Sequence, residues 1–229
     1  MQSVANLFVK NRKIGDGRKS MELEKIKCVI LDFDNTMYSY GDWTRGDALT
    51  EEFLKEQKIL PGVENKLEEL KKIYPDLHLY QRVFAYFRDN GLDDGVYRKF
   101  NNEGIPDIRT KDTVFIKPEI IEKISKKYKL FMISDSFLSY LLYYLELNKI
   151  DKDWFDGIYQ NNYEDDDYTK IPMMKKVLTN TGLKPDEIVM VGDNELTDIV
   201  PAKSLGYQTY HVKDVFDTEN FLNELIKFK

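Results

Sequence analysis

Short apolar segments recur along the chain and indicate its architecture. Most of them are continuous rather than alternating, which is typical of strands buried on both faces of a parallel sheet. They lie at Cys28–Leu31, Leu130–Ile133, Phe155–Tyr159, Ile188–Val191 and Gln208–Val212. We therefore predict five strands in one sheet.

The segments between these strands repeat apolar residues at helical spacing. Ile120, Ile121, Ile124 and Tyr128 fall on one face of a helix that Pro118 can begin, because proline suits the first turn. Two further faces have the same spacing: Leu138, Leu141, Leu142 and Leu145, and then Met174, Val177 and Leu178 between Pro172 and the capping Gly182. This alternation predicts an α/β fold with a doubly wound, Rossmann-like parallel sheet.

One long segment interrupts the alternation. Residues 39–117 contain helical periodicity and no good strand, and they are rich in Tyr and Phe. The clearest helical face is Val63, Leu67, Leu70 and Ile73. We predict an all-helical cap domain at 39–117, inserted after the first strand of a core domain made of residues 21–38 and 118–229. Residues 1–20 are expected to be a flexible N-terminal extension.

The composition of the chain argues against several classes of protein. The chain has 229 residues, of which 42% are hydrophobic, enough for a large core. Its formal net charge of −6 argues against a nucleic-acid partner, because phosphate binding needs a basic face. The single Cys28 excludes an internal disulfide and fits a reducing compartment. No apolar stretch approaches the roughly 18 residues of a membrane span, and no secretory signal is evident, so we expect a cytoplasmic protein without a membrane partner.

Polar side chains follow the predicted strands at their carboxyl ends. Asp32 and Asp34 follow the first strand, Ser134 ends the second, and Asp193 and Asp198 follow the fourth. Because the carboxyl ends of parallel strands meet at one edge of the sheet, these residues are predicted to share a crevice. Four carboxylates repel one another unless a cation lies between them. Oxygen ligands without His or Cys suit a hard ion such as Mg²⁺ rather than zinc.

The order of these residues resembles that of the haloacid dehalogenase (HAD) superfamily. The resemblance covers roughly residues 26–40 and 115–215, and the predicted insert lies where the family's C1-type helical cap lies. The matching motifs are Asp32-Phe33-Asp34-Asn35-Thr36 (DxDx(T/V)), Ser134 (the second motif), Lys170 ahead of Ile171-Pro172 (the third) and Gly192-Asp193-Asn194-Glu195-Leu196-Thr197-Asp198 (GDxxxxD).

The resemblance implies a Mg²⁺-dependent phosphatase that hydrolyses a small phosphorylated metabolite through an aspartyl-phosphate intermediate. Asp32 would be the nucleophile and Asp34 the general acid–base. The implied ligands of the substrate phosphate are Ser134, Lys170 and Asn35, and those of Mg²⁺ are Asp32, Asp34 (through its backbone carbonyl), Asp193 and Asp198. Thr36 would help to lock the turn.

Two other lysines are candidates for the third motif. Lys175 and Lys176 follow Lys170 closely, although they lie in the predicted helix and at least one of them must point to solvent.

The chain departs from the family pattern at Pro201, where the family usually has a small helix former. It is tolerated if the helix begins near Asp198, because it then falls in the first turn.

Other functions also stay open at this point. A phosphotransferase or mutase would use the same residues with a different acceptor. A haloacid dehalogenase would attack carbon with the same aspartate and needs neither Asp34 nor Mg²⁺. A receiver-like phospho-acceptor domain carries its phosphorylated aspartate on the third strand and lacks a long insert. The phosphatase is favoured, and Asp34-Asn35-Thr36-Met37-Tyr38 is similar to the nucleotidase-like branch; substrate identity and oligomeric state stay open.

Overall fold

The computed structural model describes residues 21–39, 63–75, 79–92, 113–160 and 169–228, with a few single positions between 48 and 95. The predicted N-terminal extension, residues 1–20, and much of the predicted insert lie outside the described residues. Among the residues described, no helix combines the length and the apolar character needed to cross a bilayer.

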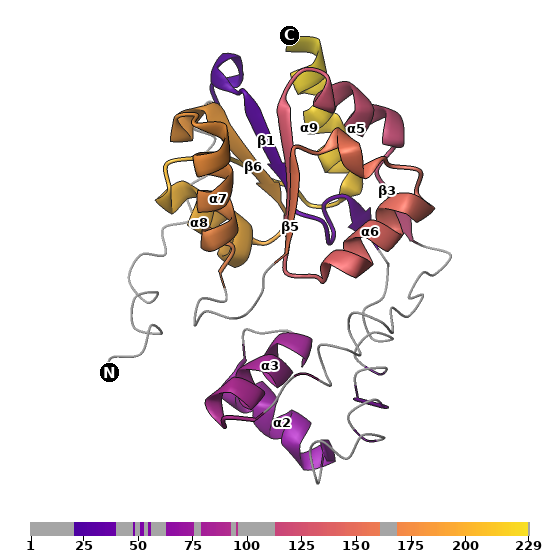
Figure 1. The fold of residues 1–229 in the computed structure, drawn as a ribbon, viewed down its shortest axis with the longest axis vertical. Coiled ribbons are helices and arrows are strands. Elements are labelled where there is room, and N and C mark those ends of the chain that lie inside the picture. Colours follow the sequence, from indigo (N-terminus) through magenta and orange to yellow (C-terminus); the bar gives the residue numbers. More distant parts are fainter. Residues whose placement is uncertain are drawn as a thin grey trace.

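A five-stranded sheet forms the centre of the molecule, and all of its neighbouring strands are parallel (Figure 1). The strands, in their order across the sheet, are β5 (Gly157–Gln160), β4 (Lys129–Ser134), β1 (Cys28–Leu31), β6 (Ile188–Gly192) and β7 (Gln208–His211). The α/β, Rossmann-like fold predicted from the sequence is confirmed. The first strand of the chain is the central one, so whatever follows it lies in the middle of the carboxyl edge.

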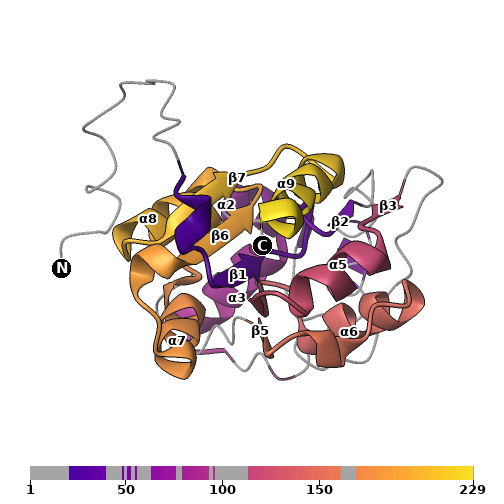
Figure 2. The same ribbon diagram turned by 90° about the horizontal axis from the view of Figure 1, so that it is seen from above.

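Helices cover both faces of this sheet (Figure 2). On one face lie α5 (Pro118–Ser125), α6 (Leu138–Leu147) and α9 (Val215–Phe228), which pack on one set of strand side chains. On the other lie α7 (Ile171–Thr181) and α8 (Val200–Ser204), which pack on the alternate set. Because both faces are covered, the central strands β1 and β6 are buried throughout, and β4 is buried beyond its first residue, as their continuous apolar runs indicate. The edge strands β5 and β7 are mostly half-buried.

Local sequence explains where several of these helices begin and end. Pro118 and Pro172 each lie in the first turn of a helix, α5 and α7, where a proline costs no hydrogen bond. Gly182 ends α7 in the left-handed conformation, with φ at 63°, which glycine adopts without a steric penalty. Pro201 lies in the first turn of α8, so the departure from the family pattern is tolerated as predicted.

The buried face of α6 differs from the prediction. The sequence predicts Leu138 on that face, but 38% of its surface is exposed, and Tyr144 is buried in its place beside Leu141 and Leu145. Leu138 is the first residue of α6, and the buried face of the helix is formed by residues of its later turns.

Two helices of the predicted insert are described, α2 (Val63–Ile73) and α3 (Leu79–Asp89), and they lie beyond the carboxyl ends of the strands (Figure 1). They share a small apolar cluster of their own, which Phe137 of the main domain joins. The Phe137 ring lies 5.9 Å, centroid to centroid, from the ring of Phe84 on α3. The insert therefore contacts the loop between β4 and α6.

Two short strands mark the borders of the insert. β2 (Tyr38–Ser39) and β3 (Val114–Phe115) pair antiparallel, so the chain leaves and re-enters the main domain at one place. The prediction that residues 39–117 contain no strand is therefore wrong at this border. Each strand has only two residues, too few to produce a periodic pattern, and its partner lies far away in the sequence.

Candidate active site

Strand β1 places Asp32 at the centre of the carboxyl edge. The Asp32 backbone N–H donates to the carbonyl of Val191 at 2.9 Å, which continues the β1–β6 ladder one residue beyond the strand. The Asp32 side chain is buried, and the hydroxyl of Thr36 donates to its Oδ2 at 3.5 Å. Thr36 also closes the turn, because its backbone N–H donates to the carbonyl of Phe33.

Asn35 allows the chain to reverse immediately after Asp34. Its φ is 56°, in the left-handed region, which Asn tolerates better than most residues that carry a side chain. Burial and the nearby Asp198 raise the pKa of Asp193, and the charge of Lys170 and then a hydrogen bond from the Asn35 side chain only partly oppose them. Asn35 thus contacts an acid of the fourth motif, in addition to the phosphate role that the resemblance implies.

Three carboxylates from different parts of the chain converge at this edge. Asp32, Asp193 and Asp198 each place one oxygen within 4.8 Å of the other two. Asp32 and Asp198 are buried, and Asp193 is half-buried. Burial raises the pKa of Asp32 well above its ordinary value, and the neighbouring carboxylates raise it further against the opposing charge of Lys170. The negative charge of Asp32 is therefore unfavourable here, and a bound cation would stabilise it.

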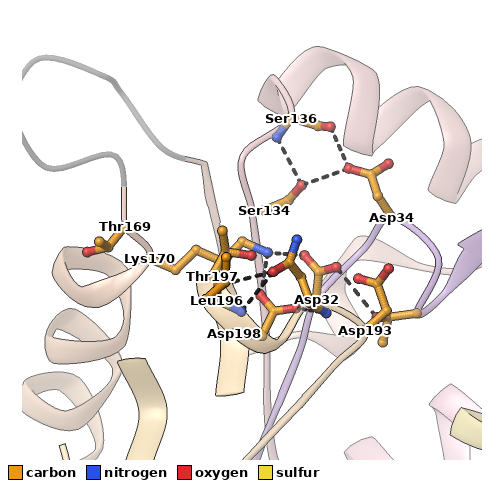
Figure 3. Close-up of polar contacts among 12 residues, drawn as sticks. Asp32, Asp34, Ser134, Ser136, Thr169, Lys170, Asp193, Leu196, Thr197 and Asp198 are labelled. Atoms are coloured by element: carbon orange, nitrogen blue, oxygen red, sulfur yellow. Dashed lines mark hydrogen bonds and ion pairs between the residues drawn. The ribbon is translucent and has the colours of Figure 1, made fainter. Parts of the chain in front are cut away.

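Lys170 lies directly against this cluster. Its Nζ donates to Oδ1 of Asp32 at 2.5 Å and to Oδ1 of Asp198 at 2.7 Å (Figure 3). Burial alone would lower the pKa of Lys170, but Asp198 and Asp32 raise it well above its ordinary value, so the ammonium is charged. Lys175 and Lys176, the alternatives for the third motif, are exposed on α7, and Lys176 lies over the ring of the half-buried Tyr159.

The turn after β6 holds Asp198 in place. One π-helical turn, Glu195–Ile199, leads into α8, and Oδ2 of Asp198 accepts a hydrogen bond from the backbone N–H of Asn194 at 3.0 Å. The Asn194 side chain in turn accepts from the first N–H groups of that turn and caps it. Gly192 lies beneath, and a Cβ there would be only 2.3 Å from Asp198 Oδ2, so the close approach requires glycine.

Asp34 belongs to a second polar group. Figure 3 shows its carboxylate turned toward Ser134 and Ser136, away from the three clustered acids. The Ser136 hydroxyl donates to Asp34 Oδ2 at 2.7 Å, and the Ser134 hydroxyl lies 3.4 Å from the same oxygen. Ser134 also accepts the backbone N–H of Ser136 at 3.0 Å. The two acids of the first motif therefore lie in different environments: Asp32 lies beside an ammonium, and Asp34 lies beside two hydroxyls.

The structure brings together the residues that the sequence singled out and adds two more. Ser136 was not predicted, although its place two residues after Ser134 at a strand end was a usable signal. His211 was assigned no role from the sequence. It ends β7 at the same edge, and its Nε2–H donates to the carbonyl of Asp193 at 2.7 Å.

Comparison with known proteins connects this site to a family. The family model described as haloacid dehalogenase-like hydrolase matches residues 26–206, most of the chain. No curated protein is significantly similar to it in sequence.

Solved structures share the fold at low sequence identity. An HAD phosphatase from Thermococcus onnurineus is 17% identical, with a TM-score of 0.55 and coverage of 86% of this chain and 98% of the other. A 2-haloacid dehalogenase from Pseudomonas syringae is 19% identical, with a TM-score of 0.50 over 80% and 85% of the two chains. A magnesium-bound protein of Bacillus subtilis, YfnB, is 16% identical, with a TM-score of 0.53 over 86% and 99%.

Proposed function

Because the chain belongs to the haloacid dehalogenase-like hydrolases and is therefore an enzyme, we propose that it is a Mg²⁺-dependent phosphatase of small phosphate esters. The observation that carries this proposal is the convergence of Asp32, Asp193 and Asp198 around the ammonium of Lys170. A dehalogenase attacks an uncharged carbon and has no need of such a cluster. A phosphatase must bring a carboxylate to an anionic ester, and needs positive charge to do so.

The clustered carboxylates fit Mg²⁺ by their chemistry. They offer oxygen donors without nitrogen or sulfur, and burial together with repulsion from neighbouring carboxylates disfavours the charged forms of Asp32 and Asp193. We propose Asp32, Asp193 and the backbone carbonyl of Asp34 as ligands, with Asp198 as an outer or additional one. When bound, Mg²⁺ would offset the repulsion between the ester and the attacking carboxylate.

In the first step a carboxylate oxygen of Asp32 attacks phosphorus, and the bond from phosphorus to the leaving oxygen breaks. Asp34, as a carboxylic acid, gives its proton to that leaving oxygen. An aspartyl-phosphate remains on Asp32. Lys170 stabilises the negative charge that spreads over the transferring group, and the Ser134 hydroxyl donates to one of its oxygens.

In the second step Asp34, now a carboxylate, takes a proton from water. The water oxygen attacks phosphorus and the bond between Asp32 and phosphorus breaks, which releases inorganic phosphate and restores the Asp32 carboxylate. Asp34 thus ends the cycle protonated, as it began. One residue serves as acid and then as base because the same position faces the leaving group and later the water.

The insert, residues 39–117, is proposed as the part that selects the substrate. Its helices α2 and α3 lie beyond the carboxyl edge, where the ester would bind (Figure 1). A cap in this place excludes water from the reaction and contacts the leaving group.

Hydrolysis of p-nitrophenyl phosphate with Mg²⁺ tests the proposed reaction. We expect turnover that stops in excess chelator, and Asp32→Asn should retain no more than a few per cent of wild-type activity, because an amide is not a nucleophile. Intact-mass analysis of Asp34→Asn after substrate addition should show one added phosphoryl group. Circular dichroism confirms that both variants fold.

Two results would overturn the phosphatase assignment. Release of chloride from 2-chloropropionate in excess chelator would identify a dehalogenase. Phosphate transfer to an added sugar phosphate, with little release to water, would identify a phosphotransferase or mutase.

A further inference from the structure

We infer that Ser136 is a positioning residue for Asp34, and that helix α3 of the insert sets the place of Ser136 through Phe137. The inference rests on the proposed function, in which Asp34 transfers protons. Ser136 lies outside the four motifs. It would connect the insert to Asp34, because Ser136 donates a hydrogen bond to Asp34 and its neighbour in the chain, Phe137, packs on α3.

The first step is the contact between Ser136 and Asp34. The Ser136 hydroxyl is buried and donates to Asp34 Oδ2 at 2.7 Å, the length of a strong bond to a carboxylate. The Ser134 hydroxyl lies 3.4 Å from the same oxygen, so it contributes a weaker contact. A hydroxyl can donate one hydrogen bond, and the Ser136 hydroxyl donates it to Asp34. Of these two hydroxyls, Ser136 therefore makes the closer contact with the Asp34 carboxylate and has the larger effect on its orientation.

The second step is what holds Ser136. On its amino side the Ser136 N–H donates to the Ser134 hydroxyl at 3.0 Å, which ties it to the end of β4. On its carboxyl side it is bonded to Phe137, which is buried in the apolar cluster of the insert. There the Phe137 ring contacts the ring of Phe84 on α3, with 5.9 Å between centroids. Ser136 is thus held between the sheet and the insert, and a shift of α3 would move Phe137 and Ser136 together.

The third step is the chemical consequence. A general acid must lie within hydrogen-bond reach of the oxygen that it protonates, and a displacement of about 1 Å can cost on the order of 10²-fold in rate. Attack by Asp32 does not involve Ser136, because Asp32 is held separately by Lys170 and Thr36. Loss of the Ser136 hydroxyl should therefore impair only the steps in which Asp34 moves a proton.

Pre-steady-state burst kinetics on the full-length protein with Mg²⁺ separate these steps. With p-nitrophenyl phosphate the leaving group needs little protonation, so Ser136→Ala should leave the burst of p-nitrophenolate within about twofold of wild type. With phenyl phosphate, a poorer leaving group, we expect the same variant to slow the burst by about tenfold or more. Ser136→Thr keeps the hydroxyl and should restore most of this loss.

A double-mutant cycle tests whether Ser136 acts through Asp34. Asp34→Asn alone should show the same dependence on the leaving group, with a larger loss. Ser136→Ala added to Asp34→Asn should then cause no further loss, because the group that it positions is no longer an acid.

A matched pair of variants tests the part played by the insert. Phe84 and Phe87 both lie on α3, and each is 2% exposed in the same cluster. The Phe84 ring contacts the Phe137 ring, and the Phe87 ring lies 6.5 Å from the ring of Tyr86. Phe84→Leu should reproduce the selective loss on phenyl phosphate, and Phe87→Leu should not, although both remove a similar amount of apolar surface.

The outcomes are distinguishable. Equal slowing of both esters by Ser136→Ala, or further slowing when it is combined with Asp34→Asn, would overturn the positioning role. Equal effects of Phe84→Leu and Phe87→Leu would overturn the connection to the insert. If Asp34→Asn itself shows no dependence on the leaving group, the proposed acid–base role is wrong. If Asp34→Asn behaves as expected and Ser136→Ala has no effect, only the present inference fails.

Discussion

At the scale of the residue, Lys170 is a charged group removed from water. Its side chain is 4% exposed, and its ammonium contacts two carboxylates that are themselves almost fully buried. Such a group is costly to bury, and it persists only where its partners are close and well oriented. A charged donor held rigidly in a dry crevice is also what stabilises a phosphoryl group in transfer.

We therefore expect Lys170→Ala to lower kcat by on the order of 10²-fold, or about 3 kcal/mol, the usual effect of losing one preorganised donor. Lys176→Ala should leave kcat nearly unchanged, because this exposed side chain lies over the ring of Tyr159. Steady-state hydrolysis of p-nitrophenyl phosphate measures both. A larger loss for Lys176→Ala than for Lys170→Ala would place the third motif inside α7.

At the scale of the element, the turn between β6 and α8 shows how a backbone position controls a side chain. Gly192 ends the strand, and the Asp198 carboxylate lies where a side chain at 192 would have to be. Asp198 can lie close to Asp32, Lys170 and Asp193 only because residue 192 has no Cβ.

We predict that Gly192→Ala displaces Asp198 and weakens Mg²⁺ binding by about tenfold or more, a loss typical of a change beside metal ligands. Isothermal titration of the metal measures this without turnover. Gly182→Ala is the matched control. It has a positive φ but nothing within 4 Å of the added Cβ, so we expect a stability cost of about 1 kcal/mol and unchanged Mg²⁺ affinity. Equal effects on Mg²⁺ binding would contradict the role of Gly192.

At the scale of the whole molecule, the clustered acids connect metal binding to the stability of the fold. Burial, together with neighbouring carboxylates, raises the pKa values of Asp32 and Asp193 in the metal-free protein. A raised pKa means that the folded state holds these protons more tightly than the unfolded chain. The stability they contribute is therefore present below the ordinary carboxyl pKa of about 4, and is lost as the pH rises through the folded-state values.

It follows that, in chelator, Asp193→Asn should be more stable than the wild type, and that the difference should grow as the pH rises from 4 to 7. An amide removes one of the repelling charges. Excess Mg²⁺ should reverse the order at pH 7, because the wild type gains more from binding the metal. Thermal unfolding in chelator and in Mg²⁺ across this pH range measures both effects. A wild type that is the more stable form at pH 7 in chelator would contradict the repulsion.

Deleting most of the insert tests the proposed role of the cap. A folded variant that lacks it should discriminate less among phosphate esters, while hydrolysis of a small generic ester is less affected, because the insert would supply contacts to the leaving group. Ranking a panel of esters for both proteins measures this. An unchanged ranking would argue against selection by the insert.

The sequence by itself determined the sheet, its parallel strands and the edge at which the polar residues meet. These features are local: a strand buried on both faces needs a continuous apolar run, and the residue that follows it is carried to the carboxyl edge. Asp32, Ser134 and Asp193 were placed in this way. Helix starts and ends such as Pro172 and Gly182 followed for the same reason.

Only the tertiary structure decided how the side chains at that edge are paired. The sequence left three lysines as candidates, and the contact of Lys170 with Asp32 and Asp198 separates them. It also could not show that Asp34 turns toward Ser136, or that β2 and β3 pair across the insert. Each of these contacts joins residues that are distant in the chain and depends on side-chain direction or on the closure of a long loop, neither of which leaves a periodic pattern in the sequence.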